Sequence, residues 1–599
     1  MDKRESTTDL AAVAMGRKPG TLIIRNGSLV NVLTGRIEAN TDVIVQGTTI
    51  ALVGDASSHP IGKDTEVIDA AGRFILPGLI DSHMHVESSM VDLPSFAAGI
   101  LPHGTTTICP DNHEITNVFG LKAVELFKLT SENLPLKVYP AMPVCVPSLP
   151  GMEDAGASIS ADEVKEAYEK GWAELQGEQM NFPGMIYGDP AAHAITAEGL
   201  KAGKVLTGHF ASPDNHRGLN AFIASGITAC HESTQADEAL EKASRGMYVQ
   251  MRYGSAWLDL PNLIPALLEN PDMDTRMFTM VTDDVTPSTI VKEGHLVRVL
   301  REAVRLGVPP EKAVQMVTIN AAQLLEKSRW IGSVSPGRAA DILLVNNLED
   351  FNMELVISGG IPVAENGRLL RPMPSYDYPE WATGSVHIPP QLAEDFAVPA
   401  MGPDSIDLRV IRLIPGMVYT KQEKHSFVPR RGQFHAAPEK DLAKISVIYR
   451  HEAVIPPEHH RSSAFLTGLG FKSGCAYAST VSHDCHNLLV IGTDDEAMAL
   501  AANTLIESGG GLTVVENGKV LSLMNLPLAG LMSLKSVEEA SVELESIEEA
   551  LRIIGCPHES VEMTLSLLGL IVLGELHLSN RGLVELKDGE SPRFVNLFD

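Results

Sequence analysis

The sequence predicts an α/β protein: a (β/α)₈ TIM-type barrel, a small β-sandwich built from both flanks of that barrel, and a C-terminal α+β domain. Short apolar runs alternate with longer helix-like stretches over residues 75–328, a pattern typical of parallel strands joined by helices. Two β-rich pieces bracket that segment. The chain has 599 residues, which is too long for a single core.

The residues on either side of the central segment have a different sequence pattern from the segment itself. Residues 1–20 form an N-terminal extension. Residues 21–74 alternate apolar and polar side chains and are broken by turn-forming pairs such as Asn26-Gly27. Residues 329–372 show a similar alternating pattern. We therefore expect these two pieces to form one β-sandwich around the domain inserted between them.

Eight apolar runs in residues 75–328 predict the strands of the barrel. Each run ends near Gly, Asp, His or Glu and precedes a helix-like stretch. Eight units in about 250 residues match the size of a (β/α)₈ barrel, whose active site lies at the C-terminal ends of its strands. The runs are 75–80, 105–109, 136–145, 173–175, 204–207, 226–229, 247–252 and 276–282.

The remaining third of the chain begins with a linker. Residues 373–400 are rich in Pro, Tyr and Glu. Residues 401–599 then carry their own apolar runs, at 487–491 and 512–515, and a helix-like stretch at 494–507. This mixture predicts a separate C-terminal α+β domain.

Composition excludes several classes of partner. The 76 acidic residues exceed the 47 basic ones and give a formal charge of -29, which repels phosphate backbones and anionic lipid surfaces. No apolar run approaches the roughly 18 to 20 residues that span a bilayer. Six cysteines without a Cys-x-x-Cys pair fit free thiols in a reducing compartment. We expect a cytoplasmic protein that binds neither nucleic acid nor membrane.

The first barrel strand ends in a His-x-His pair. His83 and His85 directly follow an apolar run. Side chains at i and i+2 of an extended segment point to the same side, so both imidazoles can reach one metal ion. A strand that ends in this way is typical of a metallohydrolase.

Other metal-binding side chains follow the later strands, where a barrel makes them converge. Four imidazoles and two carboxylates suit two divalent ions, with Mn or Fe preferred and Zn as an alternative. Glu178 is placed to bridge them. The predicted metal ligands are His83, His85, Glu178, His209, His231 and Asp283.

The motifs around these residues resemble a known superfamily. The segments PGLIDSHMH at 77–85 and GSVSPGRAAD at 332–341 are similar to those of the amidohydrolases. Five further segments are more specific: HVESSM at 85–90, PHGTT at 102–106, GEQMNFPG at 177–184, TDD at 282–284 and ASTVSHDCHN at 478–487. Through them the chain resembles, more narrowly, the bacterial adenine deaminases, and this resemblance covers nearly all of it beyond residue 20.

The resemblance implies hydrolytic deamination of adenine to hypoxanthine and ammonia by a metal-activated hydroxide, in purine salvage. It also implies a small-molecule purine base as the partner, and a homo-oligomer, a dimer. Asp283 is our candidate for moving the proton from water to the departing amine. Asp284 is the alternative, since consecutive strand residues point in opposite directions. Glu232 is our choice to protonate the ring nitrogen.

Further residues are expected at the substrate. Glu87 and Glu114 are second choices for the ring-nitrogen acid. The cluster of His483, Asp484 and His486 could hold a third metal, but we prefer a wall or lid at the barrel mouth, or an interface. The predicted substrate-binding residues are Glu87, His113, Glu114, His483 and His486.

Two competing interpretations remain at this point. The first is another amidohydrolase, acting on a related aminopurine or a cyclic amide, such as a guanine-directed or dihydroorotase-like enzyme. Glu178 argues against the dihydroorotase-like form, because such barrels usually carry a carboxylated lysine there. The second is a structural relative without catalysis, which all six predicted ligands disfavour.

Overall fold

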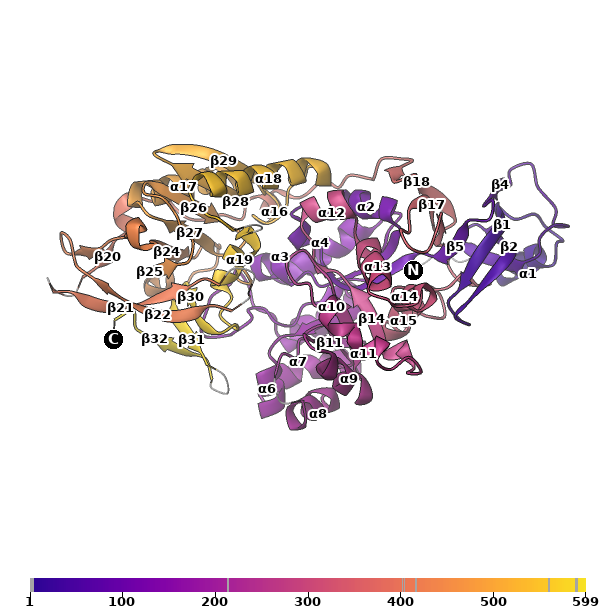
Figure 1. Ribbon diagram of the computed structural model, residues 1–599, viewed down its shortest axis with the longest axis horizontal. Helices are drawn as coiled ribbons and strands as arrows, with labels where there is room; N and C mark the ends of the chain where they lie inside the picture. The colour runs from indigo at the N-terminus through magenta and orange to yellow at the C-terminus, as the bar shows by residue number, and fades with distance from the viewer. Residues whose placement is uncertain are drawn as a thin grey trace.

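The protein, seen in a computed structural model, is described over residues 5–212, 215–400, 402, 404–414, 417, 419–558, 561–587 and 591–598. It is elongated, with the N-terminal strands at one end, parallel strands and their helices in the middle, and the C-terminal strands at the other end (Figure 1). Within the described residues, we find no helix with both the length and the apolar character needed to cross a membrane.

Both flanks of the central segment contribute to one nine-stranded sheet. The strands β5 and β16 pair antiparallel, with Leu76 opposite Leu343, and so join the two flanks. The structure joins the strands of both flanks in one sheet of order β19-β18-β17-β16-β5-β1-β2-β3, with β4 beside β1. The strands are β1 (Leu22–Asn31), β2 (Arg36–Gln46), β3 (Thr49–Gly54), β4 (Glu66–Asp69), β5 (Phe74–Pro77), β16 (Ile342–Val345), β17 (Met353–Ser358), β18 (Ile361–Glu365) and β19 (Arg368–Leu369).

The N-terminal extension contains a helix. In α1 (Thr7–Ala14) the N-cap Ser6 accepts a hydrogen bond from the backbone N–H of Asp9. Val13 on this helix is fully buried and belongs to the same small core as Ile23 of β1 and Ile44 of β2. The extension is therefore part of the N-terminal sheet assembly.

The strands of the central segment run parallel to one another. They form two sheets, with orders β15-β6-β7-β8 and β14-β13-β12-β11-β10-β9. One residue, Thr282, separates β14 from β15, and Tyr139 and Pro140 separate β8 from β9. The strands are β6 (Leu79–His85), β7 (Thr105–Pro110), β8 (Lys137–Val138), β9 (Ala141–Met142), β10 (Leu175–Gln179), β11 (Leu206–Gly208), β12 (Ala229–Cys230), β13 (Tyr248–Arg252), β14 (Phe278–Val281) and β15 (Asp283–Asp284).

Two predicted strands differ from the observed ones. The third run, 136–145, is split between β8 and β9, since Pro140 has no N–H to donate to a ladder. The fourth strand begins where the predicted run 173–175 ends and continues to Gln179. Glu178 therefore lies within the strand and not after it. The sequence QGEQ has no apolar run, so the strand could not be predicted from apolar residues, although every residue of β10 is buried.

Helices follow these strands and surround them (Figure 1). Local signals fix their ends: a capping box between Ser160 and Glu163 starts α5, and Gly171 ends it with a φ of 70° that glycine adopts readily. The helices are α2 (Leu93–Ile100), α3 (His113–Phe119), α4 (Leu121–Ser131), α5 (Ala161–Lys170), α6 (Phe182–Tyr187), α7 (Pro190–Lys201), α8 (Arg217–Ala224), α9 (Ala236–Ser244), α10 (Leu260–Leu263), α11 (Pro265–Leu268), α12 (Pro287–Glu293), α13 (Leu296–Arg305), α14 (Pro310–Met316) and α15 (Ile319–Leu324).

The C-terminal region is built on an eight-stranded sheet of order β22-β21-β25-β24-β27-β26-β28-β29, with a separate three-stranded sheet β30-β31-β32 and the pair β20-β23. Its elements are α16 (Glu380–Thr383), β20 (Val398–Pro399), β21 (Ile406–Arg412), β22 (Lys421–Phe427), β23 (Gln433–Phe434), β24 (Leu442–Ile448), β25 (Arg461–Thr467), β26 (Cys475–Ser479), β27 (Leu488–Gly492), α17 (Asp495–Ser508), β28 (Gly511–Glu516), β29 (Lys519–Asn525), α18 (Val537–Ile553), α19 (Val561–Ser566), β30 (Glu575–Ser579), β31 (Gly582–Leu586) and β32 (Arg593–Val595).

The C-terminal region packs directly on the central segment. The hydroxyl of Ser541 on α18 donates to that of Ser288 on α12 at 3.1 Å. Gly99 on α2 lies so close to α18 that a Cβ there would come within 2.8 Å of Val537. This close contact brings the loop after β26 to the C-terminal ends of the central strands.

Candidate active site

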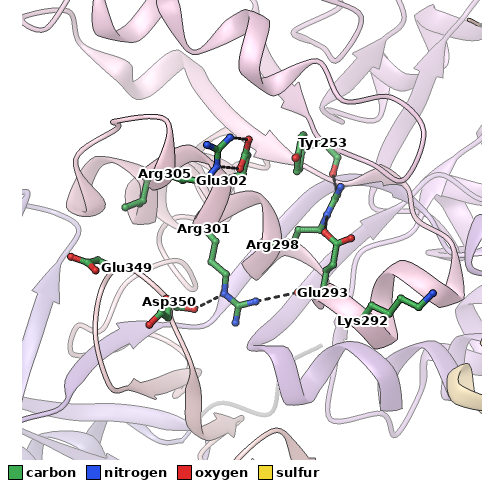
Figure 2. A pocket seen from close by; sticks show the side chains of 10 residues that line it. Tyr253, Lys292, Glu293, Arg298, Arg301, Glu302, Arg305, Glu349 and Asp350 are labelled. Atoms are coloured by element: carbon green, nitrogen blue, oxygen red, sulfur yellow. Dashed lines mark hydrogen bonds and ion pairs between the residues drawn. The ribbon is translucent and has the colours of Figure 1, made fainter. Parts of the chain in front are cut away.

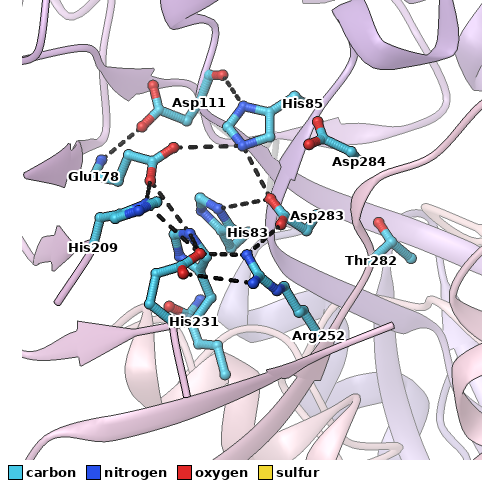
Figure 3. A network of polar contacts seen from close by, with 12 residues as sticks. His83, His85, Asp111, Glu178, His209, His231, Arg252, Thr282, Asp283 and Asp284 are labelled. Carbon is cyan, nitrogen blue, oxygen red and sulfur yellow. Dashed lines mark hydrogen bonds and ion pairs between the residues drawn. The ribbon is translucent and has the colours of Figure 1, made fainter. Parts of the chain in front are cut away.

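The C-terminal ends of the central strands bring together the six predicted metal ligands (Figure 3). His83 and His85 come from β6, Glu178 from β10 and Asp283 from β15, while His209 and His231 follow β11 and β12. Five of these side chains are buried, and His209 is partly exposed. The rings of His83 and His231 stack with their centroids 3.9 Å apart, although the two residues are 148 positions apart in the sequence.

The orientation of His85 is fixed by a backbone contact. Its Nδ1 lies 2.8 Å from the carbonyl oxygen of Asp111. Because a carbonyl can only accept, Nδ1 carries the proton and Nε2 is left free to bind a metal. The side chain of Asp111 in turn accepts a hydrogen bond from the backbone N–H of Glu178 at 2.6 Å. Asp111 thus positions two predicted ligands at once.

Glu178 lies between two sets of imidazoles. One carboxylate oxygen, Oε1, is 3.5 Å from Nε2 of His85. The other, Oε2, is 2.7 Å from Nδ1 of His209 and 3.3 Å from Nε2 of His231. Burial would raise the pKa of Glu178, but the neighbouring imidazoles, His231 first, hold it well below its usual range. The carboxylate is therefore ionised and shared by both sides of the cluster.

Asp283 and Asp284 face different partners. Oδ1 of Asp283 lies 3.4 Å from Nε2 of His83 and 3.2 Å from Nε2 of His85. The carboxylate of Asp284 instead accepts a hydrogen bond from the hydroxyl of Ser88. Burial would raise the pKa of Asp283, but its histidine contacts hold it well below its usual range. For Asp284, burial and the negative charge of Asp283 both raise the pKa.

The donor set fits divalent metal ions. Nε2 of His83 is buried and has no hydrogen-bond partner among the described residues, which is costly unless a ligand satisfies it. Two groups of candidate ligands share Glu178: one with His83 and His85, the other with His209 and His231. Imidazole nitrogens and carboxylate oxygens are ligands of Zn, Mn and Fe.

Arg252, at the end of β13, belongs to this cluster but was not predicted from the sequence. Its guanidinium pairs with Glu232, with Asp259 at 2.6 Å and with Oδ2 of Asp283 at 3.3 Å. Burial would raise the pKa of Glu232, but the charge of Arg252 outweighs it and lowers the pKa to about 2. A carboxylate held ionised in this way is a poor proton donor. The sequence contained a signal for this position, because the seventh predicted strand ends in Arg252 at the edge where the predicted ligands converge.

The C-terminal region places imidazoles next to the predicted ligands. Nδ1 of His483 is 2.8 Å from Oε1 of Glu114, and His486 contacts the other oxygen of the same carboxylate. Nε2 of His113 lies 3.5 Å from Oε1 of Glu114. Glu87 accepts a hydrogen bond from the backbone N–H of Ile115, the residue that follows Glu114. Glu114, His483 and His486 also form a group with metal-binding geometry.

A cavity of about 110 Å³, which we call the strand-end cavity, opens beside these residues. His113, Glu114, His483 and Asp284 line it together with the metal ligands, whereas Glu87 and His486 line a smaller cavity next to it. Trp257 and Met180 provide apolar surface. The opposite wall comes from the C-terminal region, through Leu567, Leu570 and Leu573.

A larger cavity, of about 690 Å³, lies elsewhere, beside α13 (Figure 2). Its arginines already have protein partners. Arg298 pairs with Glu293 at 2.5 Å and donates to the carbonyls of Tyr253 and Gly254. Arg301 donates to the carbonyl oxygens of Glu293 and Asp350. The cavity lacks the ligand set found at the strand ends.

Comparisons with known proteins agree with this geometry. Residues 74–363 match the model of the Amidohydrolase family, and residues 417–590 match the Adenine deaminase C-terminal domain. The chain is 44% identical over 600 residues to the adenine deaminase of Clostridium botulinum, covering 99% of this chain and 98% of that protein. The chain belongs to the adenine deaminase family.

Other adenine deaminases are similar over the same length. The enzyme of Moorella thermoacetica is 44% identical over 585 residues, with 97% of this chain and 96% of that protein covered. Adenine deaminase 3 of Rhizobium meliloti is 40% identical over 592 residues, with 98% of each covered. The similarity therefore covers both the C-terminal region and the central segment. The central segment is that of the amidohydrolase family, whose fold is a TIM-type barrel.

Proposed function

We propose that this protein catalyses the hydrolytic deamination of adenine to hypoxanthine and ammonia, as its relatives' names indicate. The observation that carries the proposal is the buried cluster of four imidazoles and two carboxylates beside a small cavity. A planar base is a suitable occupant, because the cavity has an apolar wall and a polar floor.

We propose two divalent metal ions, Mn or Fe, as cofactors. His83, His85 and Asp283 would hold one, His209 and His231 the other, and Glu178 would bridge them, since its two oxygens face the two sets. Bound there, the ions supply Lewis acidity that makes hydroxide available near neutral pH.

Asp283 is our candidate to move protons during turnover. Its Oδ1 faces the imidazoles of β6, and Arg252 contacts its Oδ2, so the guanidinium orients the carboxylate. We propose that Asp283 accepts a proton from the attacking water and passes it to the departing amine, because ammonia leaves far more easily than an amide anion.

For the ring nitrogen we propose a proton donor other than Glu232. The ion pair with Arg252 supports an electrostatic role for Glu232. We propose instead that His483 supplies this proton, since it lines the strand-end cavity and its Nδ1 lies 2.8 Å from Glu114. Burial would lower the pKa of His483, but the charge of Glu114 outweighs it and raises that pKa to about 9. In this arrangement the C-terminal region takes part in the chemistry.

The C-terminal region also closes the site. Leu567 and Leu570 are at least nine-tenths buried, and together with Leu573 they form the apolar wall of the strand-end cavity. Excluding water strengthens the electrostatic interactions inside the cavity and protects the proton transfers. We propose that this wall fits against the face of the purine.

Several broader proposals go with this function. We propose that the two parallel sheets form one closed (β/α)₈ barrel over 75–328, that 21–74 and 329–372 form one sandwich domain, and that 401–599 is a domain joined by the linker 373–400. We also propose a dimer that acts on a purine base in purine salvage. Six buried free cysteines support a reducing compartment, the cytoplasm.

Ammonia release tests the proposed function. The full chain, reconstituted with Mn or Fe, is assayed with adenine, guanine, cytosine, adenosine and hydantoin. Adenine should be turned over with the highest kcat/KM. Faster release from guanine, or ring opening of hydantoin without adenine turnover, would point to a different member of the amidohydrolase superfamily.

A further inference from the structure

His486 contacts the candidate active site without lining the strand-end cavity. It comes from the loop after β26, lies 372 positions after Glu114, and still reaches the carboxylate of that residue. His486 lines only the smaller neighbouring cavity, whereas Glu114 and His483 line both cavities. Any effect of His486 on a base in the strand-end cavity must therefore pass through Glu114.

The tautomer of His486 follows from its backbone contact. Its Nδ1 accepts a hydrogen bond from the backbone N–H of Ser482 at 3.2 Å. Because that N–H can only donate, Nδ1 carries no proton, and the proton of the neutral ring is on Nε2. Burial lowers the pKa of His486 to about 4, so the ring is neutral. His486 thus donates its single ring N–H to Oε2 of Glu114.

The backbone of His486 is held from several sides. Arg450 is fully buried and donates to the carbonyl oxygens of His486, Ser385 and Ala529. The backbone N–H of His486 donates to the carbonyl oxygen of Ser482 at 2.8 Å. The φ of His486 is 49°, in the left-handed region, a conformation that persists where surrounding contacts determine it. The position of the imidazole ring is therefore fixed.

The two oxygens of Glu114 divide between two histidines. Oε2 accepts from His486, and Oε1 lies 2.8 Å from Nδ1 of His483. Burial would raise the pKa of Glu114, but the neighbouring imidazoles, His483 first, hold it well below its usual range. With Oε2 held, Oε1 stays directed at His483. Since Nδ1 of His483 faces Glu114, Nε2 is the nitrogen left for a base in the strand-end cavity.

The hydrogen bonds decide between an orienting role and a metal site for this cluster. Glu114, His483 and His486 have metal-binding geometry. Among the described residues, however, none of their side-chain nitrogen or oxygen atoms is buried without a hydrogen-bond partner, whereas Nε2 of His83 is. Both ring nitrogens of His486 are already used. The cluster is thus satisfied without an ion.

We propose that His486 is a positioning residue for protonation of the ring nitrogen: its hydrogen bond holds the carboxylate of Glu114, which in turn orients His483. Acid–base sites commonly contain such a third group, which orients the histidine that transfers the proton. His486 itself does not touch the base. This inference rests on the proposed function, because His483 is the proton donor proposed there.

Two substitutions separate the hydrogen bond from the fold of the loop. His486→Asn suits the left-handed backbone, but its side chain is too short to reach Glu114. It should lower kcat for adenine by about tenfold or more and change KM by less than about threefold. His486→Gln reaches the position of Nε2 and can donate an amide N–H, so its kcat should stay within about threefold of the unaltered chain.

A double-mutant cycle tests whether His486 acts through His483. In a His483→Asn background, His486→Asn should lower kcat by less than about twofold, because the group that it orients is already absent. A general structural defect would lower kcat by the same factor in both backgrounds. Equal losses would therefore overturn the positioning role, and so would unchanged turnover of His486→Asn in the otherwise unaltered chain.

Circular dichroism and metal analysis accompany each kinetic measurement on the metal-reconstituted full chain. If His486→Asn does not fold, His486→Met, which cannot donate to Glu114, replaces it in both backgrounds. A further ion that the unaltered chain binds and His486→Asn loses would make the cluster a metal site and overturn the proposal. Absence of adenine turnover in the unaltered chain would contradict the proposed function together with this role, whereas equal losses in the cycle would overturn this role alone.

Discussion

Replacing Asp283 by Asn removes one negative charge at the centre of the predicted site and changes little else. The side chain keeps its size. Asp283 has a φ of 59°, in the left-handed region, and Asn tolerates that conformation as Asp does. The backbone should therefore remain in place. The lost contacts are those of the carboxylate with His83, His85 and Arg252.

The expected loss follows from the two roles of this carboxylate. General acid–base catalysis contributes about 10² to 10⁴-fold, which is about 3 to 5.5 kcal/mol of activation free energy. Because Asp283 would serve both water activation and leaving-group protonation, kcat should fall at or beyond the upper end of that range. KM should change much less, since the apolar wall that we propose binds the base is unaltered.

The assay is steady-state ammonia release from adenine, with metal analysis of each sample. Asp284→Asn is the matched control, because Asp284 is hydrogen-bonded to Ser88 and the substitution changes charge by the same amount. We expect less than about a tenfold loss in kcat there, well short of a general acid–base contribution. If Asp284→Asn is the more damaging change while Asp283→Asn turns over almost normally, the proton carrier is Asp284 and the assignment is wrong.

Three further predictions concern the metals, the C-terminal region and stability. Glu178→Gln should weaken at least one metal site, because a neutral amide cannot balance two cations; a chain that still binds two ions tightly would remove the bridging role. His483→Asn should keep its metals but lower kcat by about 10²-fold or more, and unchanged turnover would exclude His483 from proton transfer. Burial raises the pKa of Glu562 from 4.5 to about 8, so the folded state holds this proton more tightly than the unfolded chain does. The associated stability is present below pH 4.5 and is lost as the pH rises through about 8. Calorimetry should therefore show a smaller fall in Tm between pH 5 and pH 8.5 for Glu562→Gln than for the unaltered chain, and parallel falls would count against a buried, protonated Glu562.

Much of the candidate metal-binding cluster could be predicted from the sequence because it depends on local order. His83 and His85 share one face of a strand, and parallel strands end at the same edge, so later polar residues at strand ends must converge with them. Glu178 was predicted at the right edge even though its strand was placed too early. Periodicity was weak there, since QGEQ has no apolar alternation.

The parts that escaped prediction depend on tertiary contacts. Leu570 follows Glu178 by almost four hundred positions, and only the packing of the C-terminal region brings it to the cavity. The pairing of Arg252 with Glu232 could not be predicted from the sequence either, because an arginine at the end of a strand has many possible partners. Likewise, strand alternation predicted that only one aspartate of the 283–284 pair points toward the candidate metal ligands, but it could not say which one.

The most direct test of the account is a metal titration of adenine turnover. Metal-free full chain is supplied with increasing Mn or Fe, and bound metal, hypoxanthine and ammonia are measured on the same samples. The account predicts no turnover without metal, equal amounts of the two products, and a rate that reaches its plateau at two ions per chain. Turnover that is independent of metal, or that is complete at one ion per chain, would contradict it.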